Sequence, residues 1–250
     1  MITHRILNFN LDLWEMICMS DDGVSFLRQL DFFNPEEDAQ PIINLIGCGG
    51  IGSYVGLYLA TMGFKNIIGW DADFVDNHNL PNQAFTLKHL GMKKTDALAD
   101  MIVEKVGVTI KTKNRFFTED SHVNEGIVIA ATDSISSRKL IWKEVKNKPG
   151  IIGFIDGRLG GLATDVYIID PNDPDDITFY EESLFGEGEA MDLPCTARAV
   201  IFIAAEIAAT ICEATRELAK GLPHYRNVRK DHLNGVMEFD GQALIAVKRK

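Results

Sequence analysis

The residues with the clearest chemistry lie in a glycine-rich stretch near the start of the chain. Residues 42–46 are mostly apolar, and the next six positions hold four glycines, Gly47, Gly49, Gly50 and Gly52. In such a turn the first glycine permits a tight bend, a middle one lets a phosphate approach the backbone, and the last lets a helix pack closely on the strand. The N–H groups at the start of the helix would then face an anion. We predict a phosphate-binding unit of strand, turn and helix.

An acidic residue follows at the spacing used for ribose recognition. A second apolar run, 66–70, ends at Asp71, 19 residues beyond Gly52. In dinucleotide-binding folds an acid about 20 residues after the glycine turn binds the ribose hydroxyl groups. A glycine-rich turn that binds nothing is the alternative. The order of strand, turn, helix, strand and acid favours nucleotide binding.

A dense polar segment leads from Asp71 to a pair of lysines. Residues 71–83 have no helical or strand periodicity, so we expect a loop at the carboxyl end of the second strand, where open α/β sheets bind ligands. Lys93 and Lys94 then begin an apolar-periodic segment, where positive charge opposes the helix dipole. Residues that are unfavourable for the local secondary structure often belong to a functional site. A solvated loop would explain the polarity of residues 71–83 but not these lysines.

A further carboxylate stands at the tip of a uniformly apolar segment. Residues 127–131 have the composition of a central parallel strand, and Asp133 follows them closely. Asp133 is therefore expected beside the glycine turn. It could instead cap the helix that begins near Ser136, but a cap would stand nearer the helix start. We favour a role in binding a ligand or a metal.

These residues need a framework of alternating strands and helices. We predict a doubly wound, Rossmann-like α/β domain at residues 41–250, with a mostly parallel sheet and an antiparallel extension, preceded by an N-terminal helical arm at 1–40. Further elements are expected as strands at 108–112, 150–162, 163–170, 236–239 and 243–247, and as a buried helix at 199–218. Residues 171–194 are expected to form a long mobile loop and 223–235 a basic connection.

The composition restricts the class of protein. The chain has 25 basic and 36 acidic residues and a formal net charge of −11, which argues against binding of nucleic acid. No segment approaches the roughly 18 uninterrupted apolar residues of a membrane span, and no signal-peptide core is evident. We expect a soluble, cytoplasmic protein. The four cysteines form no C-x-x-C pair, so no structural zinc is expected.

Taken together, these segments resemble the ubiquitin-activating-enzyme-like family, whose bacterial members are the ThiF, MoeB and HesA adenylyltransferases. The resemblance runs from about Ile42 to Lys220. Its matching pieces occur in the family's order, and they are residues 47–53, the Asp71 and Asp73 loop with Asn79, Leu80 and Gln83, Gly91 with Lys94, and residues 131–133 followed by Arg138. Any one piece would be weak evidence, whereas the four in this order are specific.

The resemblance implies a reaction and a set of site residues. ATP and the C-terminal carboxylate of a small ubiquitin-like or sulfur-carrier protein, or of a peptide, would give an acyl-adenylate and pyrophosphate. The ATP-binding set that the resemblance implies is Gly47, Gly49, Gly50, Gly52, Asp71, Asp73, Asn79, Asn82, Gln83 and Lys94. Within it Lys94 would act on the triphosphate, and Asp133 would bind Mg²⁺. A homodimer is also expected.

One position departs from the family pattern. Family members usually have arginine where this chain has Asn82, and an amide cannot supply the charge of a guanidinium. Either activity is reduced or altered, or another group contacts the α-phosphate. The candidates are Arg158 and, from the N-terminal arm of a partner, Arg5 or Arg28. The sequence does not choose among them.

Cys195 is a candidate for transfer of the activated carboxyl group. It resembles the family's acceptor thiol in position, between the expected loop and the expected helix, and a helix N-terminus with Arg198 nearby would lower a thiol pKa. A buried cysteine at a helix start is the alternative. Cys48 and Cys212 are expected to be packing residues.

Two rival functions stay open. An NAD-dependent oxidoreductase would use the same glycine turn and Asp71, but it does not explain Lys94 or the polar loop at 79–83. A catalytically idle relative that binds nucleotide as a scaffold gains some support from Asn82.

Overall fold

A mixed β-sheet forms the centre of the protein. The computed structural model describes residues 24–184 and 200–245. Within these residues the sheet has nine strands in the order β3-β2-β1-β4-β5-β6-β7-β8-β9. The parallel half consists of β1 (Ile43–Ile46), β2 (Ile67–Trp70), β3 (Lys111–Lys113), β4 (Gly126–Ala130) and β5 (Ile151–Gly160).

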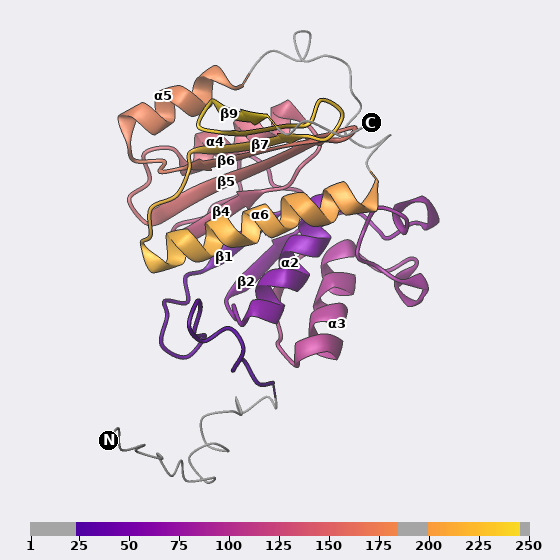
Figure 1. Ribbon diagram of the computed structural model, residues 1–250. Coiled ribbons are helices and arrows are strands. Elements are labelled where there is room, and N and C mark those ends of the chain that lie inside the picture. Colours follow the sequence, from indigo (N-terminus) through magenta and orange to yellow (C-terminus); the bar gives the residue numbers. More distant parts are fainter. Residues whose placement is uncertain (1–23, 185–199, 246–250) are drawn as a thin grey trace, which may run out of the picture.

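Helices cover both faces of the parallel half (Figure 1). One face carries α2 (Gly50–Met62), α3 (Lys94–Val106) and α6 (Ile201–Lys220). The other face carries α4 (Ile135–Val145) and α5 (Pro174–Glu182). β1 and β4 are buried at every position, because each is an apolar run between two layers of helices. The predicted α/β architecture is confirmed.

Two separate cores correspond to the two faces. Leu59, Leu98 and Ile207 belong to the core under α2, α3 and α6. Trp142 and Tyr180 belong to the core under α4 and α5.

Since the helices after β1 and β2 lie on one face and the helix after β4 lies on the other, the winding reverses between β1 and β4. Ligands of such sheets bind at the carboxyl ends of the strands at this reversal.

The antiparallel half extends the sheet beyond β5. It consists of β6 (Ala163–Ile169), β7 (Asn227–Asp231), β8 (Val236–Phe239) and β9 (Gln242–Ile245). Asp240 and Gly241, both with positive φ, join β8 to β9, as expected for the predicted hairpin. The described sheet has four antiparallel and four parallel pairings, so the antiparallel extension is larger than the sequence indicated.

Three predicted segments differ from the structure. Residues 171–184, predicted as part of a mobile loop, contain α5, because Asp173 caps a helix that starts with Pro174 and buries Tyr180. The basic connection at 223–235 contains β7, which pairs with β6. Residues 24–40 form turns and no helix, although Phe33 is buried against Phe64. The rest of the predicted arm and loop lies outside the described residues.

The third strand is displaced from its predicted position. Val108 and Ile110 are buried, but the pairing with β2 begins only at Lys111. The apolar alternation at 108–112 therefore arises because the chain is already buried just before it joins the sheet. The hydrogen-bonded strand begins at Lys111. No helix in the described part of the chain has the length and apolar character needed to cross a membrane.

Candidate active site

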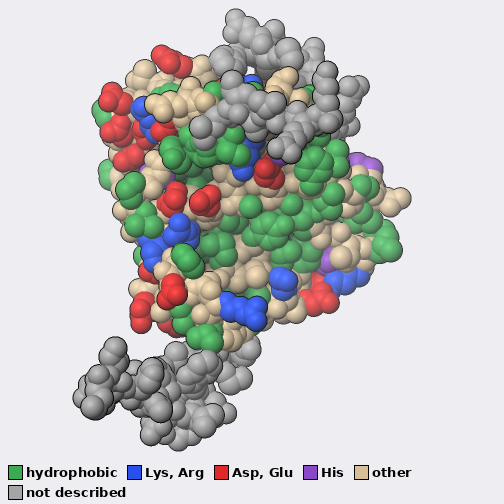
Figure 2. Space-filling model, viewed as in Figure 1, with side chains coloured by type: hydrophobic (Ala, Val, Ile, Leu, Met, Phe, Trp, Pro, Cys, Tyr) green, Lys and Arg blue, Asp and Glu red, His purple; other side chains and the backbone are tan. Residues whose placement is uncertain are grey.

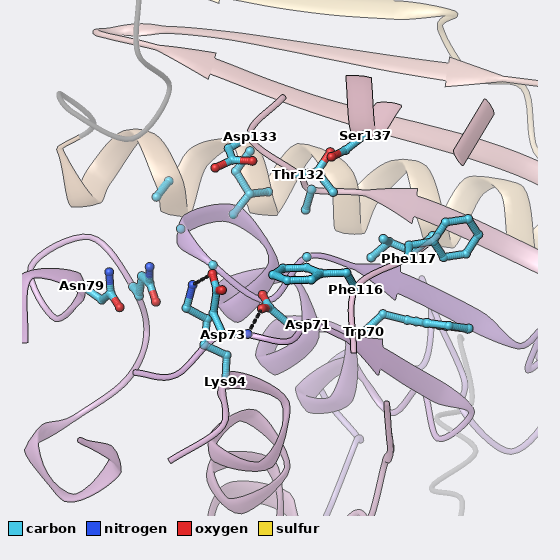
Figure 3. Close-up of a pocket in the computed structure, with 18 of the residues that line it drawn as sticks. Trp70, Asp71, Asp73, Asn79, Lys94, Phe116, Phe117, Thr132, Asp133 and Ser137 are labelled. Atoms are coloured by element: carbon cyan, nitrogen blue, oxygen red, sulfur yellow. Dashed lines mark hydrogen bonds and ion pairs between the residues drawn. The ribbon is translucent and has the colours of Figure 1, made fainter. Parts of the chain in front are cut away.

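A cavity of about 440 Å³ opens at the carboxyl edge of the sheet, where the winding reverses. Figure 3 shows side chains from separate segments converging on it. Its wall includes nearly all residues that the sequence analysis assigned to ATP, namely Gly47, Gly49, Gly50, Asp71, Asp73, Asn79, Asn82, Gln83 and Lys94. Asp133 also lies in the wall, whereas Gly52 does not.

The glycines in the turn have different physical roles. Gly47 has φ +94°, and a Cβ there would lie 2.5 Å from the carbonyl oxygen of Ala131. A Cβ on Gly52 would lie 1.9 Å from the carbonyl oxygen of Gly47, so this glycine permits close packing of α2. At Gly49 and Gly50 the nearest atom would be 3.8 Å away. Side chains at these two positions would fit, but they would occupy space beside the cavity.

The start of α2 is suited to an anion. Its N-cap is Gly49, no side chain caps it, and its first turn has no acidic residue. The first N–H groups of a helix lack partners within the helix, and its dipole favours negative charge there. The turn therefore offers hydrogen-bond donors to a phosphate group.

Asp71 joins the turn to the loop after β2. Its Oδ2 accepts the backbone N–H of Cys48 at 2.8 Å, and its Oδ1 accepts that of Asp73, also at 2.8 Å. The residue is only 9% exposed. These two bonds fix the carboxylate in place, and each oxygen keeps a lone pair with which it can accept a ribose hydroxyl.

Lys94 is the first residue of α3, and its ammonium group is directed to the cavity side of the helix (Figure 3). Its Nζ lies 2.8 Å from Oδ2 of Asp73, and its side chain is 10% exposed. This ion pair compensates for the unfavourable position at the helix N-terminus. An ammonium group has three donors, so Lys94 retains capacity for a second anionic partner.

The polar loop is more ordered than the sequence indicated. It contains the short 3₁₀ helix η1 (Asn77–Asn79), in which Asn79 Oδ1 accepts the N–H of Asp76 at 2.9 Å. The N–H of Gln83 donates to the Asn79 carbonyl oxygen at 3.0 Å. Ser53 on α2 accepts the N–H of Ala84 at 3.0 Å, which ties the end of the loop to the helix after the glycine turn.

Asp133 lies at the end of β4 and is exposed (Figure 3). The helix cap is Ser134, whose Oγ accepts the N–H of Ser137 at 3.1 Å. The alternative in which Asp133 caps α4 is therefore wrong. A single carboxylate suits Mg²⁺, which commonly takes one or two carboxylates together with substrate phosphates.

Several cavity residues were not found from the sequence. Trp70, Phe116 and Phe117 form an aromatic wall, with Trp70 and Phe117 edge to face at 5.3 Å between centroids. Two of these residues come from the loop after β3, whose apolar pair could have been noticed. Flat apolar surfaces of this kind suit a nucleobase.

The cavity wall also contains polar atoms without partners. Among the described residues, three buried side-chain atoms have no hydrogen bond: Trp70 Nε1, Gln83 Oε1 and Thr132 Oγ1. All three residues border the cavity. Because unpaired buried polar atoms are costly and rare, their concentration here fits a polar ligand.

Arg138 also borders the cavity and belongs to a buried ionic network. Asp156 accepts hydrogen bonds from Nε of Arg138 at 2.8 Å, Nε of Arg158 at 2.7 Å and the hydroxyl of Tyr180 at 2.9 Å. Burial opposes ionisation of Asp156, but the two guanidinium groups outweigh it and keep its pKa below the ordinary value. The carboxylate is therefore charged.

The structure places the two described arginines that could supply the charge missing at Asn82, Arg158 and Arg28, away from the cavity. Arg158 is held by Asp156 and by Ser183, to whose carbonyl oxygen and hydroxyl it donates at 3.0 Å, and it does not border the cavity. Arg28 is exposed, and the neighbouring Gln29 donates to the carbonyl of Met62, at the end of α2 opposite the glycine turn. Within one copy of the chain, neither reaches the cavity. Arg5 lies outside the described residues.

The cysteines divide into two groups. Cys48 and Cys212 are buried and free, as expected for packing residues. Burial raises the pKa of both thiols. Cys195 and Cys18 lie outside the described residues. Within residues 24–184 and 200–245, no group of three His, Cys, Asp or Glu side chains could hold a metal ion.

The ThiF family model matches residues 38–242. The chain belongs to the ThiF family. The matched range includes every cavity residue named above and the antiparallel strands β6, β7 and β8. The predicted resemblance is therefore confirmed.

Curated relatives of this ThiF-family chain include eukaryotic activating enzymes. It is 32% identical over 165 residues to the NEDD8-activating enzyme E1 catalytic subunit of Dictyostelium discoideum, covering 56% of this chain and 37% of the relative. It is 33% identical over 104 residues to SUMO-activating enzyme subunit 2 of the same organism, covering 39% and 16%. The chain thus spans well under half the length of these relatives.

Solved structures share its fold. PaaA superposes with a TM-score of 0.65 at 17% identity, over 84% of this chain and 67% of PaaA. Escherichia coli MccB, crystallised with AMPCPP and MccA, superposes with a TM-score of 0.60 at 17% identity, over 83% and 65%. At these sequence identities, the similarity shows a shared fold alone.

Proposed function

We propose that the protein is an ATP- and Mg²⁺-dependent adenylyltransferase. It activates the C-terminal carboxylate of a small ubiquitin-like or sulfur-carrier protein, or of a peptide. The observation that carries the proposal is the convergence of Lys94, from the start of α3, and Asp133, from the segment after β4, on the cavity beside the Gly47 turn. Family membership and the named activating enzymes among its relatives support the same reaction class.

The cavity residues supply positioning and charge compensation. The N–H groups of the α2 N-terminus and the ammonium of Lys94 face the phosphates, while Asp71 holds the ribose and the aromatic wall receives the base. Bound Mg²⁺, held by Asp133, would neutralise phosphate charge. An oxygen of the acceptor carboxylate attacks the α-phosphorus, the bond to the bridging oxygen breaks, and pyrophosphate leaves.

Exchange of labelled pyrophosphate into ATP tests this proposal. The assay is run with a panel of small diglycine-tailed proteins and peptides whose C-terminus is either free or amidated. Exchange should require a free carboxylate. Replacing Lys94 by Gln, or Asp133 by Asn, should lower the exchange rate by about 10²–10³-fold, because each removes preorganised charge at the reacting phosphate.

Lys93 offers a matched control for Lys94. Its ammonium lies 3.7 Å from the centroid of the Phe74 ring and outside the cavity wall. Lys93→Gln should therefore keep most of the exchange activity. Equal activity in wild type, Lys94→Gln and Asp133→Asn would contradict the proposal.

Binding assays separate the two rival functions. An oxidoreductase would bind NAD more tightly than ATP, whereas the cationic and metal-binding groups of the cavity favour the triphosphate. A nucleotide-binding scaffold, to which Asn82 gives weight, would bind AMPCPP with Mg²⁺ but catalyse no exchange with any acceptor. We propose the enzyme because both groups that would act on the phosphates are in the cavity wall.

Transfer to Cys195 is a further step of the proposal. Attack of its thiolate on the acyl carbon would form a thioester and release AMP. Mass spectrometry of the protein after reaction would detect the thioester, and Cys195→Ala should abolish it while pyrophosphate exchange continues. Exchange without any thioester would limit the reaction to adenylation.

A homodimer is also part of the proposal. Hydrophobic side chains gather on the face that carries α2 and α6 (Figure 2), and Ile201 and Phe202 at the start of α6 are about half exposed. Such a surface suits a second copy of the chain. Light scattering coupled to size-exclusion chromatography would give the mass, and a monomer at all concentrations would exclude the dimer.

A further inference from the structure

Within the described residues, the Asp133 side chain has neither a hydrogen bond nor an ion pair to fix its position, and it is exposed after the end of β4. Its position therefore depends on the backbone on either side of it. Ser134 holds the following residues through the cap of α4. The preceding residue, Thr132, is held by Arg138.

Arg138 bridges two strands beyond the last pair of their ladder. The parallel pairing of β4 and β5 ends at Ala130 and Asp156. Nη2 of Arg138 donates to the carbonyl oxygen of Thr132, two residues beyond Ala130, at 2.5 Å, and to that of Gly157, one residue beyond Asp156, at 3.2 Å. The guanidinium thus replaces the missing ladder bonds at the edge where the cavity opens.

Asp156 fixes the orientation of this guanidinium. The Arg138 side chain is 3% exposed and the Asp156 side chain is fully buried, with 2.8 Å between Nε and Oδ1. A planar guanidinium held through Nε presents its remaining donors in fixed directions, which an ammonium group on a flexible chain cannot do. The Thr132 carbonyl is therefore held from a rigid point inside the molecule.

We propose that Arg138 is a positioning residue, oriented by Asp156, that sets the place of Asp133 in the cavity through the Thr132 carbonyl. The inference rests on the proposed role of Asp133 toward Mg²⁺ and the nucleotide. Arg138 acts on the metal-dependent part of nucleotide binding. Arg158 shares Asp156 but holds Ser183 instead, so it has no part in this role.

The two arginines form a matched pair for the test. Affinity for AMPCPP is measured by isothermal titration calorimetry in Mg²⁺ and in EDTA, for wild type, Arg138→Lys and Arg158→Lys. Wild type should bind more tightly in Mg²⁺. We call the ratio of the affinity in Mg²⁺ to the affinity in EDTA the Mg²⁺ gain. Arg138→Lys should reduce this gain about tenfold, while its affinity in EDTA stays within about twofold of wild type. Arg158→Lys should retain the full gain.

A double-mutant cycle with Asp133→Asn identifies the route of the effect. If Arg138 acts through Asp133, Arg138→Lys should cause no further loss of the Mg²⁺ gain in the Asp133→Asn background. Additive losses would overturn the inference, as would equal losses in Mg²⁺ and EDTA, or a loss in Arg158→Lys that matches Arg138→Lys. Where Arg138→Lys does not fold, Arg138→Gln, whose side-chain NH2 group can still donate hydrogen bonds, is used in the same cycle.

The outcome also separates this inference from the proposed function. A wild-type protein whose affinity for AMPCPP does not respond to Mg²⁺ overturns the metal role of Asp133 and the inference with it. A wild type that responds, together with an Arg138→Lys variant that responds equally, overturns the inference alone. Pyrophosphate exchange by wild type then still supports the adenylation reaction.

Discussion

Glycines that lie close together in the sequence have different roles at the cavity, and their spacing alone does not distinguish these roles. Gly50 and Gly52 both stand in the first turn of α2, two positions apart. Gly50 borders the cavity, whereas Gly52 packs against the carbonyl of Gly47. One glycine leaves room for a ligand, and the other leaves room for the protein itself.

Adding a methyl group at these two positions should therefore have opposite consequences. Gly50→Ala should leave the free energy of unfolding unchanged or raise it by up to about 1 kcal/mol, since alanine favours the helix. Its affinity for AMPCPP should fall by about tenfold or more, because the methyl group occupies the approach of a phosphate.

Gly52→Ala should instead lower the free energy of unfolding by about 1–3 kcal/mol, because its Cβ would overlap the Gly47 carbonyl oxygen. Urea denaturation and calorimetry measure the two quantities separately. Equal losses of stability in both variants would show that Gly50 has a packing role.

At the scale of elements, α5 is the clearest departure from prediction. The segment around it is acidic and rich in Gly and Pro, which is typical of loops, yet residues 174–182 are helical. Asp173 accepts the N–H groups of Asp175 at 2.9 Å and Asp176 at 3.0 Å. Proline at the first position and a cap before it are a helix start signal that the composition concealed.

Removing this cap should weaken α5. Asp173→Ala should lower the free energy of unfolding by about 0.5–2 kcal/mol, because two N–H groups lose their partner. Asp175→Ala is the matched control: its side chain is exposed in the first turn and contributes only a few tenths of a kcal/mol through the helix dipole. Chemical denaturation measures both variants, and an equal effect of the two would argue against the cap.

The elements that could be predicted are those in which local pattern and tertiary burial agree. β1, β2 and β4 are short apolar runs, and the helix that became α6 is long and rich in Ala and Ile. β7 could not be predicted, because its polar sequence, Asn227–Asp231, becomes a strand only by pairing with β6.

The same distinction holds for the site. The glycines, Asp71, Lys94 and Asp133 could be found because local motifs carry them. Arg138 was noticed only as a motif residue, since its contacts depend on Asp156, 18 positions away on β5. Trp70 and Phe116 become neighbours of the cavity only when β2 and the loop after β3 are side by side.

At the scale of the whole molecule, Asp156 connects α4, β5 and α5 through the side chains of Arg138, Arg158 and Tyr180. Burial alone would raise the pKa of Asp156, but both guanidinium groups outweigh it and lower that pKa. Asp165 on β6 shows the reverse: burial raises its pKa, and the hydrogen bonds from Asn227 and Tyr167 offset this only in part.

These opposite shifts predict opposite dependences of stability on pH. For Asp156 the native pKa is lowered, so its contribution is complete above the unfolded pKa of about 3.9 and disappears as pH falls through the native value. For Asp165 the native pKa is raised, so wild type loses stability relative to an uncharged variant as pH rises from about 4 through the native value.

Urea denaturation at a series of pH values from neutral to acidic would test both signs with Asp156→Asn and Asp165→Asn. Near neutral pH, Asp156→Asn should be less stable than wild type by about 3–5 kcal/mol, because two buried guanidinium groups lose their counter-charge. The difference should shrink as pH falls below about 4. For Asp165→Asn, the stability relative to wild type should rise with pH over the range above about 4. A difference for Asp156→Asn that stays constant with pH would mean that the Asp156 carboxyl group has the same pKa in the native and the unfolded protein. The ionic link between α4, β5 and α5 would then be lost as an explanation of how the cavity edge is held.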